Sequence, residues 1–124
     1  LGRITDRKDF TQAAEKSLRL FANRLQQVPQ AVSCLLQALD FSLDEPCRAV
    51  VAGNPGSPET RASLGAIHSV YQPNKVVLGN TGAVEPFART LSASGGSMVY
   101  LCTGAACQPP TRDLASIKEL FKQK

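Results

Sequence analysis

Three short apolar runs in the second half of this 124-residue chain constrain its fold more than any other feature. The runs contain β-branched residues and lie at Arg48–Ala52, Lys75–Leu78 and Met98–Cys102. Each is apolar at consecutive positions rather than at alternate ones, which is typical of strands covered on both faces in a parallel sheet. They stand far enough apart for the connections of about a dozen residues or more that parallel strands require. We therefore predict a small three-stranded parallel sheet.

Helical segments separate and follow these runs. Apolar residues recur there at three- and four-residue steps, which is the period of one helix face. The predicted stripes are Leu64, Ile67 and Tyr71; Val84, Phe87, Ala88 and Leu91; and Leu114, Ile117 and Phe121. Residues 46–124 therefore predict an α/β domain of order β-α-β-α-β-α, with the Ile67 helix across one face of the sheet.

The first third of the chain, residues 1–45, predicts a helical hairpin. Apolar residues at helical spacing run through residues 10–25 and 32–43, and Pro29 separates the two stretches. Asp6 is a candidate N-cap of the first helix, and Pro29 suits the first turn of the second. Two helices are thus expected between residues 7 and 43, ahead of the α/β domain.

The second helix of this hairpin is almost without charge. From Gln30 to Leu43, Asp40 is the only ionisable group apart from Cys34, and a helix so poor in charge is normally covered over most of its surface. Because the chain also begins without methionine, we expect a segment of a longer protein whose hairpin exposes apolar residues or buries them against a second copy. The side chains concerned are Leu18, Phe21, Leu35, Leu36 and Leu39.

Composition excludes several classes of protein. The chain is 43% hydrophobic and 19% charged, which is typical of a folded protein. A net charge of +4 without clustering, 6% aromatic residues and no tryptophan argue against nucleic-acid binding. No run approaches the ~18 apolar residues of a membrane span, and the N-terminus lacks the apolar core of a secretory signal. Four scattered cysteines are too few for a disulfide scaffold, so we expect a reducing, cytoplasmic location.

A glycine-rich segment, Val51–Thr60, follows the first run. It lacks the lysine and hydroxyl of a P-loop and the third glycine of a dinucleotide-binding motif. Ser57 as an N-cap and Pro58 at the first helical position explain it without a ligand. The alternative is a small-ligand site, because ligands bind beyond the carboxyl ends of parallel strands. Such a rim would comprise Gly53, Asn54, Gly79, Asn80, Thr103 and Gly104.

The cysteines favour structural roles. Cys102 and Cys107 form a C-x4-C pair that is close enough to be bridged if the loop folds back, but it lacks the C-x-x-C spacing and the helix N-terminus that favour a reactive thiolate. We expect structural thiols or an incidental disulfide, with a thiol switch as the alternative. Cys34 and Cys47 are expected in the core, and His68 is expected to pack or hydrogen-bond. No catalytic residue, metal site or cofactor is predicted.

Several stretches carry a resemblance to a known family. They are the opening LGRITD, the segment Ile67–Leu78 (IHSVYQPNKVVL), Tyr100–Cys102 and the segment Cys107–Asp113 (CQPPTRD). Together they resemble the C-terminal region of the spermatogenesis-associated, thioredoxin-domain-containing proteins, a family with many bacterial members. The opening residues and the helices after them resemble the last hairpin of the family's helical toroid, and the loop from residue 80 to residue 97 departs from the family pattern.

The resemblance implies a bacterial-type member. In such proteins a thioredoxin-like domain precedes a toroid similar to six-hairpin glycosidases, and a small α/β region closes the chain. Neither active site would lie in this segment, although Cys102 and Cys107 match family cysteines. A likeness of fold does not transfer an activity.

The sequence thus favours a non-catalytic C-terminal docking module of a larger thioredoxin-domain protein. Its partner would be the rest of its own chain, and any redox or carbohydrate-related role would belong to the whole. The alternatives are an independent small-ligand-binding domain and a thiol switch at Cys102 and Cys107. We expect no nucleic acid and no membrane as a partner, and self-association of the segment on its own.

Overall fold

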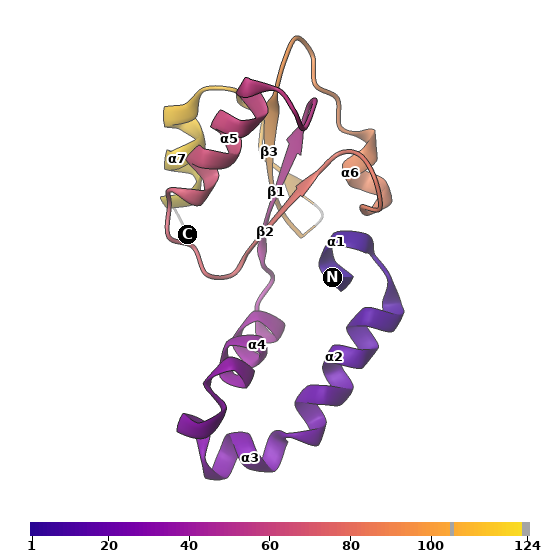
Figure 1. Cartoon of the computed structure of the whole chain (residues 1–124), viewed down its shortest axis with the longest axis vertical. Coiled ribbons are helices and arrows are strands. Elements are labelled where there is room, and N and C mark those ends of the chain that lie inside the picture. The colour runs from indigo at the N-terminus through magenta and orange to yellow at the C-terminus, as the bar shows by residue number, and fades with distance from the viewer. Residues whose placement is uncertain (105, 123–124) are drawn as a thin grey trace.

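The computed structural model describes residues 1–104 and 106–122, in which a helical hairpin precedes an α/β part (Figure 1). The hairpin comprises α1 (Gly2–Thr5), α2 (Lys8–Leu20), α3 (Ala22–Gln27), the 3-10 helix η1 (Pro29–Val32) and α4 (Ser33–Leu43). The α/β part comprises β1 (Cys47–Ala52), α5 (Pro58–His68), β2 (Lys75–Gly79), α6 (Pro86–Thr90), β3 (Met98–Thr103), β4 (Ala106–Cys107) and α7 (Leu114–Lys122). The three apolar runs form strands as predicted, and the short β4 is additional.

The direction of the third strand differs from the prediction. Among the described residues the sheet has four strands in the order β2-β1-β3-β4. β1 and β2 are parallel, with Ala49 opposite Val77, but β3 is antiparallel to β1, with Ala49 opposite Leu101. The mixed α/β fold is confirmed, whereas the three-stranded all-parallel sheet is wrong.

The connection between β2 and β3 accounts for this difference. It carries only α6, a helix of five residues, and it brings the chain to β3 at the same end of the sheet where β2 stops. A parallel third strand would need a connection that returns along the whole sheet. The continuous apolar run at β3 predicts only that both faces of the strand are covered, and an antiparallel strand between helical layers meets that condition equally well.

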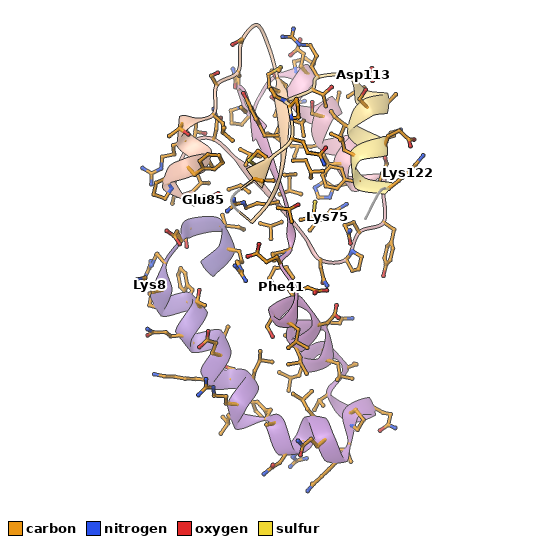
Figure 2. The ribbon with its side chains drawn as sticks, turned by 180° about the vertical axis from the view of Figure 1, so that it is seen from behind. Lys8, Phe41, Lys75, Glu85, Asp113 and Lys122 are labelled. Carbon is orange, nitrogen blue, oxygen red and sulfur yellow. A yellow bond between two sulfur atoms is a disulfide. The ribbon has the colours of Figure 1, made fainter. Side chains whose placement is uncertain are left out.

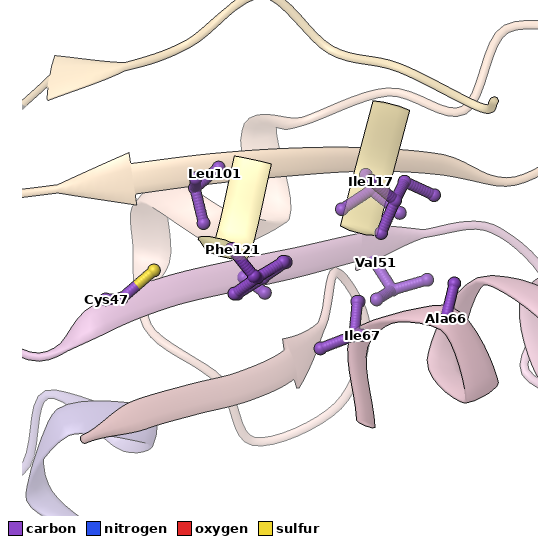
Figure 3. Packing of buried hydrophobic residues seen from close by; sticks show 9 residues of the cluster. Cys47, Val51, Ala66, Ile67, Leu101, Ile117 and Phe121 are labelled. Atoms are coloured by element: carbon purple, nitrogen blue, oxygen red, sulfur yellow. The ribbon is translucent and has the colours of Figure 1, made fainter. Parts of the chain in front are cut away.

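Helices cover both faces of the sheet and create two cores. In the first core, Ile117 and Phe121 of α7 meet Val51 of β1 and Ile67 of α5 (Figure 3). The second core lies on the opposite face, beneath α6, and consists of Val50, Val76, Leu78, Val84 and Ala88. β1 contributes to both cores, and every residue of this strand except Arg48 is buried.

The helical stripes are confirmed only on their inner sides. Ile67, Ala88, Ile117 and Phe121 are buried, as the periodicity predicts. Tyr71 lies beyond the end of α5 and is 90% exposed. Phe87 and Leu114 are also exposed large hydrophobic residues. The outer members of the stripes therefore do not reach a core.

The hairpin departs from the two predicted helices. Its first arm is divided at Phe21 into α2 and α3, and Pro29 begins the 3-10 helix that leads into α4. Asp6 is not the N-cap of α2: it ends α1 in a left-handed conformation with φ 56°, and Arg7 takes the N-cap position. Cys34, which was expected in a core, is exposed on α4.

The ends of the hairpin anchor it to the sheet. Ile4 of α1 and Phe41 of α4 pack against the second core, and Phe41 lies where the hairpin meets the α/β part (Figure 2). Asn74 Nδ2 donates a hydrogen bond of 2.7 Å to Asp40 Oδ2, close to the same junction. The middle of the hairpin has no such support, because none of the residues of α2, α3 or α4 is buried.

Polar caps fix where α5 and α7 begin. Ser57 is the N-cap of α5 as predicted, and its Oγ accepts a hydrogen bond of 3.1 Å from the Thr60 backbone N–H. Before α7, the Asp113 carboxylate accepts hydrogen bonds of 2.7 Å from both the Oγ and the backbone N–H of Ser116. The hydrogen bonds from Ser116 lower the pKa of Asp113 below its usual value of 3.8.

This lowered pKa predicts a stability that depends on pH. The Asp113 carboxylate should stabilise the fold fully above pH 3.8, and this contribution should be lost as the pH falls through the lower pKa of the folded state. In urea unfolding, Asp113→Asn, which keeps an N-cap acceptor, should be less stable than the native protein at neutral pH and should approach it in acid. Ser116→Ala should show the same trend, whereas a difference that stays constant with pH would contradict this assignment.

Candidate functional site

The predicted ligand rim is divided between the two ends of the sheet. Gly53 and Asn54 follow β1, Gly79 is the last residue of β2 and Asn80 follows it. Because β1 and β2 are parallel, all four lie at the same end of the sheet. Thr103 and Gly104 lie at the opposite end, because β3 runs antiparallel to β1. The structure therefore brings four of the six predicted residues together and corrects the placement of the other two.

Polar groups at the first end mostly satisfy one another. Asn80 Oδ1 accepts from the Gly53 N–H at 3.4 Å, and Asn80 Nδ2 donates to the Leu91 carbonyl at 3.0 Å. Asn54 Oδ1 accepts from the Gly56 N–H at 3.0 Å. Asn80 thus joins the end of β1 to the segment that follows α6, which is a structural role.

Gly53 is required at its position. Its φ of 151° is a conformation that residues with a side chain rarely adopt, and an added Cβ would lie 3.2 Å from the Ser97 Cα. Beside it is a pocket of about 310 Å³ with apolar walls and a few polar groups. The pocket is lined by Val51, Gly53, Pro55, Thr60, Leu64, Val77, Leu78, Gly79, Asn80 and Thr81. It is large enough only for a small molecule.

Cys102 and Cys107 form a disulfide across the β3–β4 hairpin. Their Cα atoms are 4.0 Å apart, and the two residues are direct partners in the antiparallel register. Cys102 is completely buried, whereas Cys107 is only partly buried. Of the expected forms of this pair, free structural thiols or a disulfide, the structure contains the disulfide, and the alternative of a thiol switch stays a prediction.

Arg48 joins this hairpin to the rest of the molecule. It lies opposite Cys102 in the β1–β3 ladder, and residues directly opposite each other in such a ladder project to the same face. Its Nη2 donates to the Gly104 carbonyl at 3.1 Å, and its Nη1 lies 2.9 Å from Glu85 Oε1. The Glu85 N–H in turn donates to the Ile4 carbonyl at 2.8 Å, so the contacts of Arg48 extend to α1.

The ion pair between Arg48 and Glu85 is largely removed from solvent. The side chains are 22% and 11% exposed. Glu85 Oε1 is buried. Arg48 Nη1 lies close to it, but no described donor, Arg48 included, is oriented to make a hydrogen bond to this oxygen. The contact is therefore mainly ionic, and its strength depends on the exclusion of water. Sequence reasoning missed this pair, although a lone charge inside an apolar strand was a signal that could have drawn attention to Arg48.

The other titratable candidates have structural surroundings. Lys75 Nζ donates to the Ile67 and Val70 carbonyls, both at 2.8 Å, and closes the end of α5. Burial lowers the pKa of this lysine. His68, which was expected to pack or to hydrogen-bond, is exposed at the end of α5, so the packing role is wrong. Within residues 1–104 and 106–122 there is no group of three or more His, Cys, Asp or Glu that could hold a metal ion.

Comparison with known proteins supports the family resemblance. Spermatogenesis-associated protein 20 of Rattus norvegicus and of Mus musculus are each 28% identical to the chain over 128 residues, and the Homo sapiens protein is 28% identical over 126 residues. The matches cover 95–97% of this chain but 16% of each relative. The chain thus corresponds to a small part of these proteins. No protein-family model matches the chain, and no solved structure was found that matches it.

None of the helices in the described part of the chain combines the length and the apolar character that crossing a membrane requires.

We expect Arg48→Met to lower the free energy of unfolding by about 2 kcal/mol, because it leaves the Glu85 carboxylate buried without its cation. The double variant Arg48→Met/Glu85→Leu should recover part of this loss, since it also removes the buried charge. A double-mutant cycle by urea unfolding measures the coupling. As a control, Lys122→Met disrupts an ion pair whose side chains are 59% and 61% exposed and should have little effect. This view would be contradicted if the double variant lost more free energy of unfolding than the two single variants lose together.

Proposed function

We propose that this chain is a non-catalytic docking module of a larger protein related to the spermatogenesis-associated, thioredoxin-domain-containing family. The observation that carries this proposal is the helical hairpin, where apolar residues recur along α2, α3 and α4 but none is buried. Of the five side chains expected to be exposed, Phe21 is 41% and Leu36 is 38% exposed, whereas Leu18, Leu35 and Leu39 are half-buried. Helix faces of this kind are normally covered by another part of a protein.

In this proposal residues 1–45 are the last hairpin of a larger helical toroid, and residues 46–124 are a small α/β domain that closes it. The partner is the rest of the same polypeptide, a bacterial-type cytoplasmic protein. The identity of 28% across 97% of the chain, against 16% of the rat relative's length, supports a module within a longer protein. Any redox or carbohydrate-related activity then belongs to the parts outside this segment.

Charge substitutions on the hairpin test the docking role. In this chain alone, Phe21→Glu/Leu36→Glu should change the free energy of unfolding by no more than about 1 kcal/mol, because both side chains already meet solvent. In the longer protein the same pair of substitutions should cost roughly 3 kcal/mol, because both charges would enter an apolar interface. Urea unfolding of the two proteins gives the comparison, with the chain alone diluted until it is monomeric so that dissociation does not contribute to its stability.

Gln37→Glu is the matched control, since it adds a charge to an exposed polar position of α4. It should be neutral in both proteins. By sedimentation equilibrium, the chain alone should self-associate, and Phe21→Glu/Leu36→Glu should return it to a monomer. A strictly monomeric native chain, together with equal effects of the pair in both proteins, would refute the docking role.

A second candidate function is the binding of a small molecule at the end of β1 and β2. The pocket of about 310 Å³ beside Gly53, Gly79 and Asn80 favours it. Its mixed lining suits a compound with an apolar body and one or two hydrogen-bonding groups. Thermal unfolding with a panel of such compounds should reveal one that stabilises the native chain but not Thr81→Trp, which fills the exposed side of the pocket. Equal stabilisation of both proteins would place the binding elsewhere.

A further inference from the structure

We propose that the Cys102–Cys107 disulfide is a thiol–disulfide exchange site for a dithiol, in which Cys107 is attacked and Cys102 leaves beside Arg48. This inference is independent of the docking role, because it rests on no residue of α2, α3 or α4. It depends on three features of the site: unequal exposure of the two cysteines, a cation directly opposite Cys102 on the neighbouring strand, and a covalent bond that closes a very short strand.

The two sulfur atoms differ in their access to an attacking thiolate. Cys102 lies completely buried in β3, whereas Cys107 is partly exposed in β4, the last strand of the sheet among the described residues. Ala106 and Gln108, on either side of Cys107, are exposed. A thiolate attacks a disulfide sulfur directly and expels the other one. Attack is therefore open at Cys107, and the sulfur that leaves is that of Cys102.

The surroundings of Cys102 favour it as the leaving group. Arg48 is its direct partner across the β1–β3 ladder, with a Cβ separation of about 5 Å expected for such pairs. The guanidinium is held in place by the Gly104 carbonyl and by Glu85. A nearby cation stabilises a thiolate, and a more stable thiolate leaves faster. Glu85 opposes this effect with its own charge, so the two residues should influence the reaction in opposite directions.

The exchange balances with a dithiol as the reductant. One thiolate of the dithiol forms a bond with Cys107 Sγ, the Cys102–Cys107 bond breaks, and its electron pair goes to Cys102 Sγ, which takes up a proton. The second thiol of the reductant then displaces Cys107 as a thiolate, which is protonated in turn. The reductant ends as a disulfide, and two electrons and two protons pass to the protein.

The sequence alone suggested that nothing near these cysteines would favour a thiolate. The structure places a cation, Arg48, on the neighbouring strand β1, which the sequence did not indicate because Arg48 is distant from Cys102 along the chain. Reduction would also remove the covalent closure between β3 and β4, so that backbone contacts alone, such as the Cys102–Cys107 and Thr103–Ala106 pairs and the hydrogen bond from Gln108 N–H to the Leu101 carbonyl, would hold this short strand. The short strand is thus the element whose attachment the exchange would change.

Trapping with glutathione tests which sulfur is attacked. The protein carries Cys34→Ser in every experiment, because Cys34 is an exposed thiol that would itself exchange. After brief reaction at neutral pH, the mixture is quenched in acid, unfolded and treated with N-ethylmaleimide. Peptide mapping should find glutathione on Cys107 and the maleimide on Cys102. Glutathione mainly on Cys102 would overturn the proposed order of events.

Rates of reduction by dithiothreitol test the role of the charges. Arg48→Met should slow reduction and Glu85→Gln should accelerate it, each by roughly threefold, the effect expected of a leaving thiol whose pKa shifts by about one unit. Arg48→Lys keeps the charge and should react nearly as fast as the native protein. Rates are measured at several low urea concentrations. A rate that does not change with urea comes from attack on the folded protein, whereas reduction after unfolding becomes faster as urea increases. Acceleration by both Arg48→Met and Glu85→Gln, or reduction only at the rate of unfolding, would refute the proposal.

Discussion

The rest of the fold depends on strand β1 being buried on both of its faces. The residues of this strand alternate between the two cores, so neither face can be left to solvent without exposing apolar surface. α5 and α7 cover one face, and α6 covers the other with help from the N-terminal helix. Ile4 and Phe41 belong to this second layer, which is why the two ends of the hairpin are held while its middle is not.

Arg48 is the exception within β1, and its charge shapes the surrounding contacts. A guanidinium at this depth is stable only with compensating partners, and it finds them in Glu85 and the Gly104 carbonyl. Glu85 precedes α6 and binds the Ile4 carbonyl through its N–H. A single half-buried charge therefore links the β3–β4 hairpin, α6 and α1. The same requirement places a cation on the face of the sheet that carries the disulfide.

The parts of the fold that follow from local pattern were predictable. The strands near Val50, Val77 and Tyr100 form where consecutive apolar residues occur, and Ser57 caps its helix as its position before Pro58 indicates. The candidate site was predictable only in part. A rim at the ends of parallel strands assumed that all three strands share one direction, and the short connection before β3 removes that basis.

By itself, the sequence determined where β1, β2, β3 and the helices between and after them form, and that apolar residues recur along the helical hairpin. These properties depend on the spacing of apolar residues within one segment, which periodicity records directly. Only the tertiary structure decided the direction of β3, the bond between Cys102 and Cys107, and the position of Arg48 opposite Cys102. The physical reason is that these features arise from contacts between segments distant in the chain. The free energies of these contacts depend on the register of the strands and on how far the two partners bury each other, and the sequence pattern of one segment records neither.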